Sequence, residues 1–281
     1  MESVQIIKNR IQSIKSTRQI TQSMRMVSTS KVQRSRKRMN KNRPFFEQAC
    51  LLADSVLSIM NGENHPYVGG NDVKTAAVVV VGGDRGLCGG YNVNVGREAA
   101  EIISSLGDVK ILTIGGKARD FCRRRIGKSA AKSYIGISEN PFFEDANEIA
   151  ALLMQWFKQK EIGSIYIVRT EFQSMLAQST KAEQIFPLVR RGEASTDIVG
   201  FEPSGSELIE QLAPFYLASA VYGAMLEASV CEQSARVTSM DSAVKSADEM
   251  IASLTLSYNQ ARQSRITQEI IEIVGGANAV G

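Results

Sequence analysis

The sequence has little that could support chemistry at a histidine, a zinc ion or a disulfide. There is a single histidine, His65, and the four cysteines are widely spaced with no CxxC pair, at Cys50, Cys88, Cys122 and Cys231. Zinc sites and disulfide frameworks need clustered ligands or regular cysteine spacing. The distribution therefore predicts reduced thiols, as in the cytosol, and no bound metal. His65 lies in an Asn-His-Pro segment that has the composition of a loop, so we expect it to be exposed and inert.

Long apolar runs are also missing. No stretch approaches the roughly 20 apolar residues that a membrane-spanning helix needs, and residues 1–10 lack the apolar run of a secretory signal peptide. The basic start of the chain has the charge of an organellar transit peptide. We interpret it as mature structure instead, because a helical pattern begins at once and continues for about 60 residues.

Glycine is absent from residues 1–61, and Pro44 is the only proline there. Alternating steps of three and four pass through Val4, Ile7, Ile11 and Ile14, which predicts a helix that Pro44 kinks. A second such pattern runs from Ser206, the expected N-cap, to about residue 274. At 1.5 Å per residue the two helices would extend roughly 90 and 100 Å, too long for ordinary globular helices.

The two predicted helices have opposite charge and small residues along their seams. Glu2 is the only acid among residues 1–43, whereas acids outnumber bases from Glu207 onward, so the helices should attract each other. The heptad positions include several serines, which bury far less apolar area than the large side chains worth about 1.5–3 kcal/mol each. These are Ser28, Ser35, Ser219, Ser229 and Ser257. We hypothesise that another protein sheathes the far part of the helical pair.

The middle of the chain alternates between strand and helix patterns, which indicates a parallel α/β sheet. A Gly/Asn/Pro-rich linker at 62–74 precedes a continuous β-branched run at 76–81, typical of a strand buried on both faces. Further strands are predicted at 109–114 and 164–170, edge strands at 183–189 and 197–201, and helices at 92–106, 117–125 and 142–160. The predicted fold is a long antiparallel coiled coil of two terminal helices (1–61 and 206–281) plus a small central Rossmann-like domain (75–202).

The glycine-rich segment 82–92 follows a buried strand and precedes a helix. Phosphate-binding loops occupy this position, because backbone N–H groups and a helix N-terminus favour anions. However, the segment lacks the Gly-Lys-Ser/Thr ending of a P-loop and does not fit GxGxxG. A tight strand-to-helix turn, with a local Asp84–Arg85 ion pair, is the alternative that we favour, and no cofactor is predicted.

Three segments carry a family resemblance. Residues 83–92, GDRGLCGGYN, resemble the (S/G)DRGLCGG(L/Y)N signature of F-type ATP synthase γ subunits. The N-terminal stretch from Ile11 to Lys31 resembles the first helix of that family, and the stretch from Tyr258 to Ala277 resembles its last helix. The three matches lie in the family's order at the start, middle and end of the chain.

The resemblance implies a non-catalytic rotor. In this family the two terminal helices form a shaft inside a hexamer of α and β subunits, which holds the nucleotide sites. The shaft base and the α/β domain contact the ε subunit and the membrane c-ring. Ion flow turns the shaft, which drives the β subunits through their binding states and regulates their ATPase activity. The expected place is the cytoplasmic face of a bacterial cell membrane, as a peripheral part of the complex without membrane insertion.

The same resemblance assigns contacts with the β subunit, carried over position by position. They are Met24, Arg25, Arg236, Arg262, Gln263, Thr267 and Glu269. Many relatives have an acid at the position of Arg25, so this chain could attract the acidic lever loop of β. Core packing is the alternative for Met24, and a solvated helix face is the alternative for Arg262 and Gln263.

One further difference from a known type of γ subunit and two rival functions complete the prediction. Residues 185–207 contain no cysteine, unlike the redox insert of the chloroplast type, so a bacterial type without thiol switching is expected. The basic run 31–43 could bind nucleic acid through phosphates, but it lacks interleaved aromatics and a helix-turn-helix signal. A Rossmann-type enzyme would need a cofactor fingerprint and acid/base residues, and neither is found.

Overall fold

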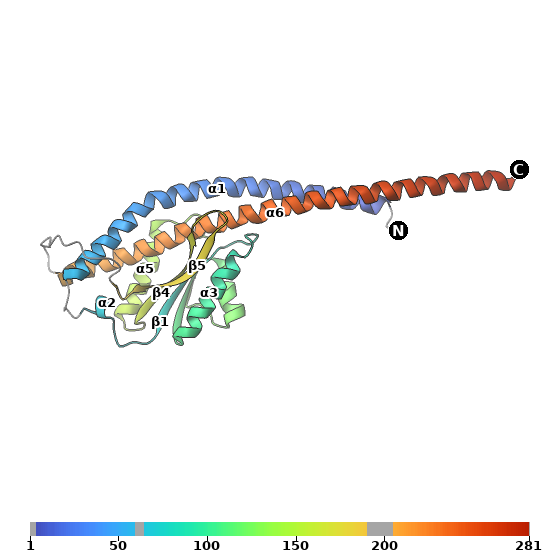
Figure 1. The fold of residues 1–281 in the computed structure, drawn as a ribbon. Coiled ribbons are helices and arrows are strands. Elements are labelled where there is room, and N and C mark those ends of the chain that lie inside the picture. Colours follow the sequence, from blue (N-terminus) through green and yellow to red (C-terminus); the bar gives the residue numbers. More distant parts are fainter. Residues whose placement is uncertain (1–3, 60–64, 190–204, 281) are drawn as a thin grey trace. The chain divides into compact units, whose positions relative to one another are not determined.

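The computed structural model describes residues 4–59, 65–189 and 205–280 (Figure 1). The chain forms two compact units. Residues 28–236 make up the α/β unit, and residues 1–27 with 237–281 make up the helical unit. The two long terminal helices that the glycine-poor patterns predicted are present as α1 (Val4–Ile59) and α6 (Gly205–Val280). Each of them contributes residues to both units.

The α/β unit is built on a five-stranded sheet in the order β3-β2-β1-β4-β5. Strands β1 (Ala76–Val81), β2 (Val109–Ile114), β3 (Lys132–Tyr134) and β4 (Ser164–Phe172) are parallel, whereas β5 (Gln178–Phe186) runs antiparallel to β4. The predicted parallel sheet is confirmed. The edge strand predicted at 183–189 lies earlier, the strand predicted at 197–201 falls outside the described residues, and β3 was not predicted.

Helices cover both faces of the sheet, so every side chain of β1 is buried. On one face, Val78 and Val80 pack with α3 (Tyr91–Leu106), α4 (Gly116–Phe121) and the following π-helical turn (Cys122–Ile126). On the other face, Ala77 and Val79 pack with α5 (Phe143–Lys158) and with α6. The apolar end of α1 joins this second core through Ala53, Val56 and Leu57. The alternation along β1 thus divides the unit into two cores.

Within the α/β unit, α1 and α6 lie antiparallel. The Oγ atoms of Ser35 and Ser229 are 3.0 Å apart, and the rings of Phe45 and Phe215 have centroids 5.3 Å apart. Residue numbers therefore rise on one helix as they fall on the other. The small-residue seam is confirmed here, because four of its serines are buried: Ser28, Ser35, Ser219 and Ser229. Ser257, in the helical unit, is exposed.

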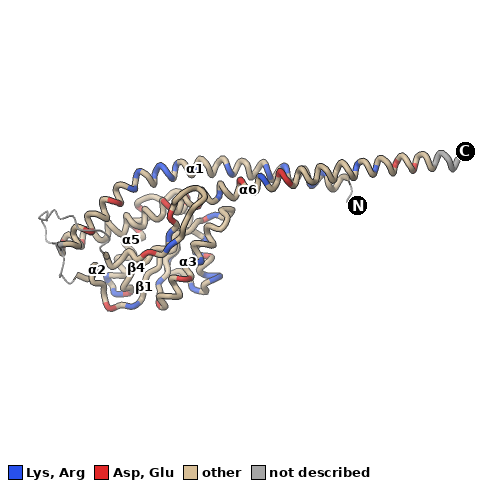
Figure 2. Tube along the Cα trace, viewed as in Figure 1, with Lys and Arg blue, Asp and Glu red and all other residues tan. Residues whose placement is uncertain are grey.

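In the helical unit, ion pairs between α1 and α6 add to the packing of the two helices; Figure 2 marks the charged residues along both. Arg18 pairs with Asp248 at 2.5 Å, and Arg25 pairs with Asp241 at 2.6 Å. These bridges run between the basic N-terminal helix and the acidic C-terminal helix, again in antiparallel order. The predicted attraction between the two helices is therefore seen in specific ion pairs, although their exposure to solvent screens them and keeps their contribution to stability small.

His65 is not the exposed loop residue that we expected. It is only 9% exposed and is the N-cap of the short helix α2 (Pro66–Gly69), where its Nδ1 accepts a hydrogen bond from the N–H of Tyr67 at 3.2 Å. Its ring also packs edge-on against that of Tyr67. The prediction was wrong because a proline at the first helical position turned the segment into a capped helix rather than a loop.

Candidate functional site

The glycine-rich segment 82–92 forms a turn between β1 and α3, and two of its backbone N–H groups donate to side chains of the protein. The N–H of Gly83 donates to Asn92 Oδ1 at 3.0 Å, and the N–H of Asp84 donates to Ser138 Oγ at 3.0 Å. Leu87 and Gly89 have positive φ, which directs the chain back toward α3. A phosphate site needs backbone N–H groups that point to solvent. Here side chains already occupy those of residues 83 and 84, so the strand-to-helix turn is the better reading.

Asp84 is enclosed by hydrogen-bond donors. Its carboxylate accepts from the N–H groups of Gly116 (2.9 Å), Gly136 (2.9 Å) and Ser138 (3.2 Å), and from Ser138 Oγ (2.7 Å). Burial alone would raise its pKa, but the bonds from Gly136, Ser138 and Gly116 outweigh that effect and lower the pKa. The predicted Asp84–Arg85 pair is wrong, because these donors hold Asp84 while Arg85 faces Glu139 at 3.9 Å.

Replacing Asp84 with asparagine should destabilise the α/β unit by about 1–2 kcal/mol near pH 7, since an amide NH₂ would face N–H donors. Because the folded-state pKa of Asp84 is lowered, its stabilisation is present above the unfolded value and is lost as pH falls through the folded value. Urea unfolding, followed by fluorescence of Trp156, the only tryptophan, measures the loss. The exposed Asp72→Asn is the control, and equal loss in both variants would contradict the role of Asp84.

The same turn is fastened to α6 by a buried ion pair. Arg236 is 6% exposed and donates to Glu232 Oε1 at 2.5 Å and to the carbonyl oxygen of Gly86 at 3.3 and 3.1 Å. Glu232 lies so close to Gly83 that a Cβ there would be 2.8 Å from its Oε2. Burial raises the pKa of Glu232, which Arg236 offsets only in part. Arg236 therefore has a role within the chain that the sequence did not reveal.

The other predicted contact residues lie in the helical unit. Met24 is half-buried, which fits a packing role, and Arg25 is paired with Asp241. Arg262, Gln263, Thr267 and Glu269 are exposed on α6. Their hydrogen bonds run along the helix, from Thr267 Oγ1 to the Gln263 carbonyl oxygen (3.0 Å) and from Arg265 Nε to Glu269 (2.8 Å). The structure thus places these four together on one helix and Arg25 against another part of α6.

Large apolar side chains are exposed beside that polar set. The exposed fraction is 46% for Ile266, 56% for Ile270 and 71% for Ile273. Contiguous exposed apolar residues of this kind mark a surface that another molecule covers. This observation supports the sequence-based hypothesis of a sheath around this part of the helices.

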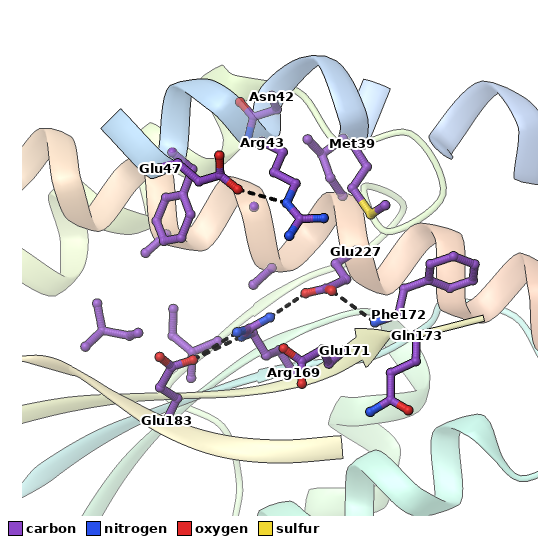
Figure 3. Close-up of a pocket in the computed structure, with 17 residues that line it drawn as sticks. Met39, Asn42, Arg43, Glu47, Arg169, Glu171, Phe172, Gln173, Glu183 and Glu227 are labelled. Carbon is purple, nitrogen blue, oxygen red and sulfur yellow. Dashed lines mark hydrogen bonds and ion pairs between the residues drawn. The ribbon is translucent and has the colours of Figure 1, made fainter. Parts of the chain in front are cut away.

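A cavity of about 460 Å³ opens in the α/β unit between α1, α6 and the β4–β5 hairpin (Figure 3). Arg169 lies on its floor, bonded to Glu183 at 3.1 Å and to Glu227. Arg43 and Glu47 of α1 pair on the opposite side. The sheet face therefore changes from an apolar core at Ile167 to a charged surface two residues later.

The four cysteines are not joined by disulfides in the structure. Cys88, Cys122 and Cys231 are buried, and Cys50 is partly buried. Burial raises the pKa of all three buried thiols, to about 11 for Cys122. Among the described residues, no cluster of histidine, cysteine and acidic side chains could hold a metal ion.

Comparisons with known proteins agree on one family. The model of the family described as ATP synthase matches residues 3–280. The "ATP synthase gamma chain" of Heliobacterium modesticaldum is 38% identical, with 100% of both chains covered. The "ATP synthase gamma chain, sodium ion specific" of Acetobacterium woodii is 37% identical, with 99% of both covered. A chain in the mitochondrial ATP synthase of Euglena gracilis shares the fold, with a TM-score of 0.69 at 15% identity over 99% of this chain and 94% of that one.

Proposed function

Because this chain belongs to the ATP synthase gamma chain family, we propose that it is the central rotor shaft of an F-type ATP synthase and has no catalytic site of its own. It would couple ion flow through the membrane sector to ATP synthesis or hydrolysis on an α/β-subunit hexamer, and would regulate ATPase activity. The proposed place is the cytoplasmic face of the membrane. No described helix combines the length and apolar character needed to cross a bilayer.

The observation that carries the proposal is the exposed apolar surface near the end of α6. Ile266, Ile270 and Ile273 are 46–71% exposed in the isolated chain, so each forgoes a large part of the about 1.5–3 kcal/mol that full burial of such a side chain is worth. A hexamer of α and β subunits would cover them. The proposed β contacts on the helical unit are Met24, Arg25 and the exposed set, namely Arg262, Gln263, Thr267 and Glu269. Arg236 would act through the turn that it holds, and ε and the c-ring are the further proposed partners.

The rival functions have less support. Within the basic run 31–43, Lys31 pairs with Glu139, Arg43 pairs with Glu47, and Arg38 donates to Asn140 Oδ1, so part of the run is engaged within the chain. The comparisons give no support to nucleic-acid binding. In segment 82–92, the N–H groups of Gly83 and Asp84 already donate to Asn92 and Ser138, so these two are not available to a nucleotide phosphate.

The test is reconstitution with α and β subunits of a related bacterial enzyme, assayed by gel filtration and ATPase rate. We expect one copy of the chain to co-elute with the hexamer and to raise its ATPase activity. Changing Arg25 to glutamate should alter turnover at least about twofold without preventing assembly, because the charge that faces the acidic lever of β is reversed.

Arg18→Glu is the matched control for that variant. It breaks an equivalent bridge to α6, with Asp248 in place of Asp241, one heptad away. If both variants change turnover equally, the effect comes from the lost bridge rather than from a β contact. If the unaltered chain neither joins nor activates the hexamer, the proposed function itself is wrong.

A further inference from the structure

The loop of residues 136–141, between β3 and α5, reaches both long helices at a single residue. Glu139 Oε1 accepts from Lys31 Nζ of α1 and from Gln233 Nε2 of α6, the latter at 3.5 Å. Its backbone carbonyl oxygen accepts from Ser229 Oγ of α6 at 3.1 Å, and Oε2 lies 3.9 Å from Arg85 of the glycine-rich turn. One residue thus meets both helices and the turn.

The residues on either side of Glu139 in the loop also form hydrogen bonds with other elements. Ser138 is bonded to Asp84, which ties the loop to the turn. On the other side, the guanidinium of Arg38 donates to Asn140 Oδ1 and to the carbonyl oxygen of Pro141, which ties the loop to α1. The loop is therefore held at three consecutive places by charged or hydroxyl side chains of separate elements, and Glu139 lies in the middle.

The cavity separates the contacts of the loop with α1 from the place where α1 packs into the apolar core. α1 joins the apolar core of the α/β unit through Ala53, Val56 and Leu57. Closer to its N-terminus, at Met39, Arg43 and Phe46, α1 lines the 460 Å³ cavity and stands off the sheet (Figure 3). The polar contacts of Lys31 and Arg38 with the loop lie beyond that cavity. They form a second attachment of α1, in which hydrogen bonds and ion pairs to the loop add to the buried side chain of Val32.

We infer that Glu139 is a positioning residue that fastens the parts of α1 and α6 that lie in the α/β unit to the sheet of that unit, so that these helix segments and the sheet turn together. This inference rests on the proposed rotor function. A hydrogen-bonded ion pair suits the purpose because its geometry is directional, whereas the hydrophobic effect is non-directional. Glu139 is charged for this role: burial acts to raise its pKa, but Lys31, Arg85 and Arg236 lower it overall.

The first test uses the purified full chain. Glu139→Gln should raise amide hydrogen exchange in residues 31–38 by roughly two- to fivefold, the change in an opening equilibrium expected when a partly exposed ion pair is lost. Glu101→Gln, which removes the same charge from an exposed position on α3, should leave exchange there unchanged. Lys31→Gln combined with Glu139→Gln should change exchange by less than the product of the two single effects, because the partners are coupled.

The second test uses the enzyme reconstituted in vesicles, with ions pumped per ATP hydrolysed as the readout. Glu139→Gln should lower this ratio while leaving assembly intact, and Glu101→Gln should not. A failure of the unaltered chain to assemble would overturn the proposed function, whereas the exchange experiment would still test the attachment. Exchange and pumping ratios equal to those of Glu101→Gln would overturn the inference.

Discussion

Replacement of Arg236 by methionine is expected to destabilise the α/β unit by about 3–5 kcal/mol, because it leaves a buried carboxylate without its partner. Glu232 is 2% exposed, and the same guanidinium also serves the carbonyl oxygen of Gly86. Methionine has a similar length and fills similar space, so the loss reports the missing charge and hydrogen bonds rather than a void.

The pH dependence of this loss has a defined sign. Burial raises the folded-state pKa of Glu232 above its unfolded value, so the folded chain gains stability from the protonated form at low pH and loses that gain as pH rises through the folded pKa. Without Arg236 the pKa of Glu232 rises further. The destabilisation by Arg236→Met should therefore be larger at pH 8 than at pH 5.

Urea unfolding followed by Trp156 fluorescence measures the effect, since Trp156 lies in the core of the α/β unit. Arg43→Met is the matched control: Arg43 forms an i,i+4 pair with Glu47, but both side chains are more than half exposed, so the cost should stay below about 0.5 kcal/mol. The double variant Glu232→Gln, Arg236→Met should recover part of the loss. A single variant no less stable than Arg43→Met would refute the buried-pair explanation.

Gly115→Ala should be comparably severe, at about 3 kcal/mol, because it combines strain with a backbone collision. Gly115 has φ +95°, and a Cβ would lie 2.6 Å from the carbonyl oxygen of Gly82 and 2.7 Å from that of Gly83. Neither carbonyl can move freely, since β1 and the glycine-rich turn meet there. The substitution should push apart the donors that surround Asp84.

Gly127→Ala separates the two causes. Gly127 also has a positive φ, +76°, but a Cβ there would meet no atom within 4 Å. Its backbone is in the left-handed helical conformation, so its cost should be that of this conformation alone, about 1 kcal/mol. Thermal unfolding of both variants gives the comparison, and similar melting temperatures for the two would show that the predicted collision is relieved by local movement.

Elements with a strong local pattern were predictable from the sequence, and elements fixed by distant partners were not. The β-branched run of β1 and the glycine-free span of α1 each specify their structure locally. Strand β3 has three residues and no fully buried side chain, so its only signal is pairing with β2. β5 begins with polar residues on an edge, which hides its start.

The same contrast holds for the candidate site. The glycine-rich turn could be located from its position between strand and helix, but the partners of Asp84 lie 32 to 54 residues away along the chain. Glu232 and Arg236 had the i,i+4 spacing of an ion pair, a signal that could have been noticed. Nothing in the sequence indicated that the pair would be buried against Gly86, since that requires α6 to pack over the turn.

The burial of the cysteines has a practical consequence for observing rotation. Thiol-reactive labels attack the thiolate, and the buried Cys88, Cys122 and Cys231 are shielded from reagent and hold their protons because their pKa values are raised. A cysteine introduced at an exposed position of the α/β unit, such as Glu101, should therefore react much faster than these three. A fluorophore or bead could be attached there with at most Cys50 replaced, leaving the three buried cysteines in place.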